Sequence, residues 1–484
     1  PEDISAQTVG DEAVDSIASP FGWHDTNGIP GSEFTDTRGN NVHVQEGALD
    51  AINANATGAR AVGGDELVFD QPYDELEHQY TPENVLAQTV QAFYMHNMLH
   101  DVYYHYGFNE AAGNYQSTNY TGQGVGGDHL IVNVNDPDAV ETGNGPAYFQ
   151  PGMTLGPLFD IGVDGQSGII ELGTYNRTAI DRGMAMDNDV VTHEHGHAVF
   201  GRIVGGPASL YPLTLDPFAD QNSSMNEGFA DFTSLWHSLD VDTTSDVGEP
   251  LGEYTTDSSL GIRRVVFSHD MAVNPLTFDD YNPDVSDPAG NGPGAGVLNS
   301  EIHNAGEIWA SVLYDMTWEL MFKYGGVEDD GVLETEAFNP DCYDSLISAP
   351  AGAGGDVSTT SNIGFDYINY DTGANNLAMQ LVLDALATQP YYSNFVDGRD
   401  AILAADVALT RGVNHDAIWK AFSRRGLGYG ADAIDVTWQD VDSSFDMPPT
   451  NAHIAGVAYV DADLDGQVDI GEARLQDVTM YIDL

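Results

Sequence analysis

Residues 190 to 201, VVTHEHGHAVFG, place three histidines and a glutamate within five positions. His193 and His197 are four residues apart, and Glu194 directly follows the first of them, which is the H-E-x-x-H pattern. On an α-helix, side chains four residues apart lie on one face, so these two imidazoles could bind one metal ion. His195 would then face nearly the opposite way. The pattern therefore predicts that His195 is a bystander whose replacement leaves the metal bound.

A β-strand offers a different arrangement, because side chains two residues apart share a face of a strand. His195 would then pair with His193 or His197 as a metal ligand. The helix is favoured because polar residues at 187–189 can cap its start and the Gly-Gly-Pro at 205–207 can end it.

Two histidines do not complete a catalytic zinc site, which usually has three protein ligands and a fourth position for water. Glu227, in the downstream segment NEGFADF, is the best candidate for the third ligand. Asp231 lies one helical turn further on and could accept a hydrogen bond from the second ring nitrogen of a ligating histidine. Glu194 would take a proton from metal-activated water and later pass it to the leaving amine. The alternative, polar residues satisfied within packed helices, is disfavoured by the two motifs occurring together.

A second ion is predicted near the end of the sequence. The segment DADLDGQVDIGE, residues 461–472, fits the twelve-residue calcium loop at each diagnostic position. The predicted calcium ligands are Asp461, Asp463, Asp465, the backbone carbonyl of Gln467, Asp469 and Glu472. The flanking residues alternate as strands do, so the segment resembles the calcium-bearing β-sandwich repeats of bacterial surface proteins, of which only the first half would be present. In so acidic a chain, a solvated carboxylate loop is the alternative.

The elements that must position these residues change character along the chain. Residues 81–107 show apolar side chains at helical spacing and predict a long, largely buried helix in an otherwise β-rich region. After residue 187, six segments have helical patterns. We therefore expect a β-rich part over 1–186, a helical part over 187–445, and a linker with a partial calcium-binding β module over 446–484.

His100, Asp101 and His105 lie within the long predicted helix, and their spacing could imitate a second metal site. Because that helix is mostly apolar, we interpret them as buried, hydrogen-bonded polar groups.

The composition narrows the possible partners. The 484 residues include 76 acidic and 14 basic side chains, a formal net charge of −62. Such a surface repels nucleic acid and anionic membranes, and it predicts a halophilic source, although an acidic secreted protein in ordinary medium remains the alternative.

Cys342 is the single cysteine, so no intrachain disulfide can form. No apolar stretch is long enough to span a bilayer, which suits either a cytosolic protein or one whose targeting segment has been removed.

Several segments resemble the fungalysin family of zinc metallopeptidases, which are thermolysin-like gluzincins. Besides the two metal motifs, the resemblance includes SPFGWHDTNG, FYMHNMLHDVYYHYGFNEAAGNYQ, HNAGEIWASVLYDMTWEL and IWKAFSRRGLG, in the family's order from about residue 19 to 430. The resemblance implies an α+β fold with two lobes, the β-rich N-terminal lobe with its long helix and the helical C-terminal lobe, and a zinc helix at the floor of the cleft. It also implies a secreted, extracellular enzyme made with an N-terminal propeptide.

Carried over to this chain, the resemblance assigns zinc to His193, His197 and Glu227 and the catalytic carboxylate to Glu194. It also matches His303, in EIHNAGEIW, to a histidine that stabilises the oxyanion, although a helix-start histidine with local hydrogen bonds is the alternative.

The chain departs from the family at two positions within its zinc motif. His195 and Gly196 stand where the family usually has an aromatic residue and threonine, and a glycine in mid-helix implies a local reason. An oxyanion-assisting tyrosine has no secure counterpart, although Tyr211 lies in the right stretch. The segment GPAYFQPG, residues 145–152, is a candidate edge strand for binding the substrate backbone, with Ala147 offering main-chain groups.

The sequence thus predicts a monomeric zinc endopeptidase that also carries calcium and acts on internal peptide bonds of protein or peptide substrates. It predicts neither nucleic-acid binding nor membrane insertion. The competing hypothesis is a calcium-stabilised cell-surface or adhesion protein that keeps a vestigial peptidase scaffold.

Overall fold

The computed structural model describes residues 14–47, 58–135, 147–150, 163–204, 206–207, 221–239, 243–282, 301–324, 373–390, 393–433 and 441–449, with only the backbone described at 147–150. The chain divides into a unit over Pro1–Met447 and a second over Pro448–Leu484. The predicted calcium loop at 461–472 and Tyr211 lie outside the described residues.

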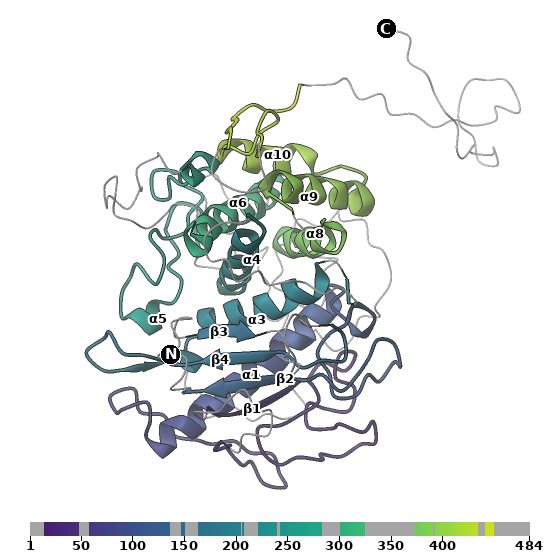
Figure 1. The fold of residues 1–484 in the computed structure, drawn as a ribbon, viewed down its shortest axis with the longest axis vertical. Helices are drawn as coiled ribbons and strands as arrows, with labels where there is room; N and C mark the ends of the chain where they lie inside the picture. Colours follow the sequence, from purple (N-terminus) through teal and green to yellow (C-terminus); the bar gives the residue numbers. More distant parts are fainter. Residues whose placement is uncertain are drawn as a thin grey trace, which may run out of the picture. The chain divides into compact units, whose positions relative to one another are not determined.

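The first unit contains a four-stranded mixed sheet, which lies between α3 and the N-terminal loops (Figure 1). Strands β1 (Val42–Glu46), β2 (Leu130–Val134) and β4 (Ile169–Leu172) are parallel neighbours, and β3 (Ala147–Gln150) pairs antiparallel with β4 at the edge. All residues of β2 and β4 are buried, as in sheets that are covered on both faces.

Helix α1 (Pro82–His105) forms the crossover between parallel strands β1 and β2 and packs on both. The Thr81 side chain caps its first turn by accepting from the Asn84 amide, and Gly107 follows its end with a φ of 98°, which suits glycine. The expected long, buried helix is therefore confirmed.

The polar residues near the end of α1 make hydrogen bonds to the segment that precedes the sheet. The Asp101 carboxylate accepts from Ser19 Oγ and from Trp23 Nε1, each at 2.7 Å, and lies 2.9 Å from His100 Nδ1. His105 Nε2 lies 3.1 Å from Asp15. As expected, His100 and Asp101 belong to a buried hydrogen-bond network, while His105 is paired with Asp15.

The helices predicted after residue 187 are also present. They are α3 (Asn188–Ile203), α4 (Gln221–Ser238), α6 (Ile302–Lys323), α8 (Ala374–Thr388), α9 (Phe395–Thr410) and α10 (His415–Arg424). A further helix, α5 (Glu253–Thr256), is about one turn long and lies between α4 and α6 in the sequence. Helix α4 packs against α3 on one side and α6 on the other, while α8 and α10 also contact α6 (Figure 1). The fold is thus a mixed arrangement of helices and a few strands. Within its described parts, no helix is both long and apolar enough to cross a membrane.

Candidate metal centre

His193 and His197 lie one turn apart on α3 and face the same side of it. The helix begins after Asp187, whose carboxylate caps it by accepting from the Asp189 amide at 3.1 Å. The two Nε2 atoms are 3.0 Å apart, and both side chains are buried. The helical interpretation of the motif is confirmed, and the strand alternative is wrong.

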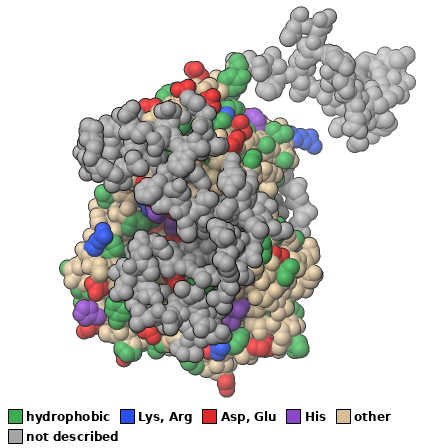
Figure 2. Space-filling view, in the orientation of Figure 1, with side chains coloured by type: hydrophobic (Ala, Val, Ile, Leu, Met, Phe, Trp, Pro, Cys, Tyr) green, Lys and Arg blue, Asp and Glu red, His purple; other side chains and the backbone are tan. Residues whose placement is uncertain are grey.

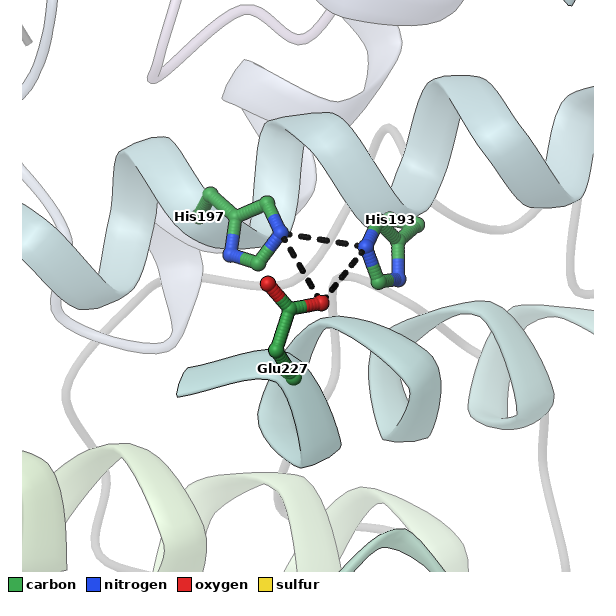
Figure 3. A group of neighbouring side chains, drawn as sticks. All are labelled: His193, His197 and Glu227. Carbon is green, nitrogen blue, oxygen red and sulfur yellow. Dashed lines mark hydrogen bonds and ion pairs between the residues drawn. The ribbon is translucent and has the colours of Figure 1, made fainter. Parts of the chain in front are cut away.

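Glu227 approaches the two imidazoles from α4 (Figure 3). Its Oε2 lies 3.4 Å from His193 Nε2 and 3.6 Å from His197 Nε2. These three side chains form the one group of potential metal ligands found among the described residues. Ligand atoms about 2 Å from a shared zinc ion have separations of this size.

The electrostatics of this cluster fit a cation. Glu227 Oε2 is buried and, within the part of the chain that the structure describes, makes no hydrogen bond of good geometry. Burial opposes a charge on His193, but Asp231 and Glu227 outweigh it and raise the pKa of His193 to about 10. Burial lowers the pKa of His197 to about 4 and so keeps its nitrogen available as a ligand. The carboxylates around His193 therefore stabilise a positive charge at this position, and a bound cation would supply one.

The far ring nitrogens of both histidines meet fixed acceptors. His193 Nδ1 lies 2.8 Å from Asp231 Oδ1, and His197 Nδ1 lies 3.0 Å from Asn226 Oδ1. Arg263 in turn donates to both carboxylate oxygens of Asp231, with Nε 2.8 Å from Oδ2. When each Nδ1 carries the proton, each Nε2 presents its lone pair toward Glu227.

Gly196 explains how α3 and α4 come close enough to share an ion. A Cβ atom at Gly196 would lie 2.9 Å from Ala230 Cα and 2.8 Å from Thr233 Oγ1, both on α4. Any larger residue would push the helices apart. This close approach is the local reason for the mid-helix glycine.

Glu194 is buried beside the cluster, and its Oε2 has no hydrogen-bond partner within the described residues. Burial raises the pKa of Glu194 to about 7, although the neighbouring His193 opposes the shift. A carboxylate with a pKa near neutrality is well matched to proton transfer.

His303 lies at the start of α6, with Nε2 3.6 Å from Glu227 Oε2. Its Nδ1 lies 2.6 Å from Glu301, the residue that caps α6. Its side chain is 49% exposed, whereas the zinc-motif histidines are buried. His303 therefore makes the local contact of a helix-start histidine and also faces the metal cluster.

Two glycines hold the start of α6 against α4. A Cβ atom at Gly306 would lie 2.7 Å from Glu227 Cβ, and one at Gly228 would lie 2.5 Å from the Gly306 carbonyl oxygen. The close crossing of these helices accounts for the position of His303 beside Glu227.

Sequence reasoning missed three side chains that orient this cluster: Asn226, Arg263 and Glu301. The sequence could have indicated Asn226, because it adjoins Glu227. It could also have indicated Glu301, because an acidic residue just before a predicted helix is a candidate cap. Arg263 had no such signal, because its partner Asp231 is remote in the sequence.

A family model and curated relatives agree on a family. Residues 1–431 match the family model described as "Fungalysin metallopeptidase (M36)". The chain is 33% identical over 406 residues to "Extracellular metalloproteinase 4" of Trichophyton tonsurans, covering 82% of this chain and 52% of that protein. It is 31% identical over 453 residues to "Extracellular metalloproteinase MEP" of Leptosphaeria maculans, covering 93% and 60% respectively. The chain thus spans about half the length of the curated relatives it matches. Among solved structures, the precursor of protealysin from Serratia proteamaculans aligns at 12% identity with a TM-score of 0.37, covering 74% of this chain and 84% of that one.

Proposed function

Because the chain belongs to the fungalysin family of metallopeptidases, we propose that it is a zinc-dependent endopeptidase that hydrolyses internal peptide bonds of proteins. The observation that carries the proposal is the convergence of two imidazole nitrogens and one carboxylate oxygen, all within 4.8 Å of one another. The donor set, two histidines and a glutamate, is one that catalytic zinc uses.

Each residue of the cluster has a role in this proposal. His193, His197 and Glu227 would hold the ion, and Asp231 would fix the ring of His193 through its Nδ1. A bound zinc ion would supply Lewis acidity and lower the pKa of a water molecule. Glu194 takes a proton from the attacking water and delivers it to the leaving nitrogen.

His303 would stabilise charge in the transition state. With Nδ1–H held by Glu301, protonated Nε2 could donate to the substrate carbonyl oxygen as that oxygen gains negative charge. The exposure of His303 leaves it accessible to a bound peptide.

Strand β3 would bind the substrate backbone. Among the described strands it is the edge strand next to β4, and it packs against α3. The backbone groups on its outer side would pair with an extended peptide. Ala147 is the first residue of this strand.

Further parts of the proposal rest on the relatives and on sequence alone. The relatives are named extracellular metalloproteinases, and we extend that location to this chain. A two-lobed division near residue 186, an N-terminal propeptide, a monomeric state and calcium bound within a β-sandwich module at 461–472 stay predictions. The vestigial-scaffold hypothesis is disfavoured because Glu194 and Asp231 accompany all three ligands in one cluster.

Casein hydrolysis by the full chain tests the proposed activity. We expect a zinc chelator to abolish hydrolysis, added zinc to restore it, and Glu194→Gln to abolish it while zinc, measured by mass spectrometry, stays bound. Full activity of Glu194→Gln would show that the proposed mechanism is wrong. A zinc-loaded wild-type protein without activity would favour the vestigial scaffold.

A further inference from the structure

Two consecutive arginines bind two different helices of the candidate active site. Arg263 pairs with Asp231 on α4, which contacts the metal-ligand candidate His193. Arg264 pairs with Glu307 on α6, the helix that begins at His303. The short segment that carries Arg263 and Arg264, between α5 and α6, therefore contacts both the carboxylate that supports His193 and the helix that carries His303.

Arg264 makes three hydrogen bonds to the first turns of α6. Its backbone amide donates to Glu307 Oε1 at 2.8 Å, and its Nε donates to Oε2 at 2.9 Å. Its Nη2 donates at 2.6 Å to the carbonyl oxygen of Asn304, the residue directly after His303. These bonds fix both the direction and the rotation of the beginning of the helix.

The Arg264 and Glu307 pair lies in a buried environment, with side-chain exposures of 13% and 2%. Such a pair adds little net stability compared with apolar side chains, because both charges lose their hydration. Its directional bonds, however, allow less rotation than apolar contacts do. Removing one partner would take away hydrogen bonds that hold the first turns of α6 in one orientation.

The position of His303 depends on that orientation. Its Nε2 lies 3.6 Å from Glu227 Oε2, close to the metal ligands, and about half of the side chain is exposed. Glu301 holds the imidazole itself, but Glu301 is the cap of the same helix and moves with it. The close crossing of α4 and α6 brings the two helices together, and Arg264 adds an anchor outside α6 that joins its first turns to the segment held on α4 by Arg263.

We infer that Arg264 and Glu307 are positioning residues that set His303 against the metal cluster, so that its imidazole meets the reacting carbonyl. This inference rests on the proposed peptidase function and deepens it. Misplacement of a catalytic group by about 1 Å can cost on the order of 100-fold in rate, so the pair affects turnover more than substrate binding.

Kinetics of the zinc-loaded full chain on a peptide substrate test the inference. We expect Arg264→Met to lower kcat by roughly 10- to 100-fold with KM little changed and zinc content equal to wild type. Arg264→Lys should recover part of the loss, because a lysine can keep one bond to Glu307. Glu307→Gln should resemble Arg264→Met.

Arg399→Met is the matched control. Arg399 is also buried and donates to the carbonyl oxygens of Leu427 and Gly428 and to Asp400, none of which belongs to α3, α4 or α6. We expect this control to lower the melting temperature as Arg264→Met does but to keep the wild-type kcat. Equal losses of kcat in both variants would reduce the effect to general destabilisation and overturn the inference.

Histidine NMR gives a readout that does not depend on activity. In protein labelled at histidine, with the His303 signal assigned from His303→Asn, Arg264→Met should shift or broaden the His303 signal and Arg399→Met should not. An unmoved His303 signal in Arg264→Met would overturn the inference whatever the kinetics. If wild-type protein lacked activity, the proposed function would fail, and the His303 signal would still decide the positioning.

Discussion

The imidazoles of His96 on α1 and His195 on α3 face one another with their Nδ1 atoms 3.0 Å apart. Both side chains are buried, and the His195 ring also stacks on Tyr103 at 5.7 Å between centroids. One Nδ1 must donate and the other accept, so the pair requires complementary tautomers. His195 therefore faces α1 and not the metal cluster, and it helps fix the zinc-motif helix to the rest of the fold.

Replacing His195 tests whether it is a bystander to the metal. We expect His195→Leu to destabilise the protein by about 1–3 kcal/mol, because it leaves a nitrogen of His96 buried without its partner. Zinc content, measured by mass spectrometry beside urea unfolding, should stay at the wild-type level. His195→Asn is the control, since its amide can replace Nδ1 and should cost less. Loss of zinc from folded His195→Leu would make His195 part of the site.

Asp231→Asn tests the support of His193. Because the carboxylate contacts His193 Nδ1 and is held by Arg263, its loss should weaken zinc binding by roughly 10- to 100-fold. Competition with a calibrated zinc chelator measures this affinity. An unchanged affinity would leave Asp231 with a role in folding alone.

Gly196→Ala distinguishes helix propensity from helix packing. On an exposed helix this substitution stabilises by up to about 1 kcal/mol. Here the new Cβ would lie 2.9 Å from Ala230 Cα, so we expect destabilisation by about 1–3 kcal/mol and weaker zinc binding. Thermal unfolding with and without zinc measures both effects. A raised melting temperature would contradict the packing explanation.

The adjacent imidazoles of His43 and His129 predict sensitivity to acid. Their ring centroids are 3.7 Å apart, and burial lowers the pKa of His43 to about 2 and that of His129 to about 4. Nearby Arg38 and Arg60 also disfavour a charge on His43. Because the unfolded chain binds these protons near pH 6.5 and the folded chain does not, stability should be full above that pH and fall as the pH drops toward 4.

His43→Phe tests this dependence through urea unfolding at pH 4.5 to 7.5. The variant should lose stability less steeply below pH 6.5, since one proton fewer binds on unfolding. An identical slope would show that His43 titrates normally in the folded protein.

The formal charge of −62 predicts that salt stabilises the fold. On the face drawn in Figure 2, acidic side chains are scattered over the described surface and basic ones appear at few places. Raising salt from 0.1 to 1 M shortens the screening length from about 10 to about 3 Å and weakens this repulsion. We expect the melting temperature to rise with sodium or potassium chloride, and a fall would count against a halophilic source.

The sequence determined the helices and the identity of the metal-binding candidates. His193 and His197 could be chosen because helical spacing and local caps are properties of neighbouring residues, and Glu227 was chosen from the downstream segment NEGFADF. The α1 boundaries followed in the same way from Thr81, Pro82 and Gly107.

Only the tertiary structure decided how these residues meet. The order β1-β2-β4-β3 and the pairings of Arg263, Arg264 and His96 join positions that are remote in the sequence, where no local pattern records the partner. Gly196, Gly228 and Gly306 read as isolated glycines in helical segments until the crossings of α3, α4 and α6 showed that each lies where a Cβ would collide. Local propensity sets the helices, but close packing between them sets the geometry that chemistry needs.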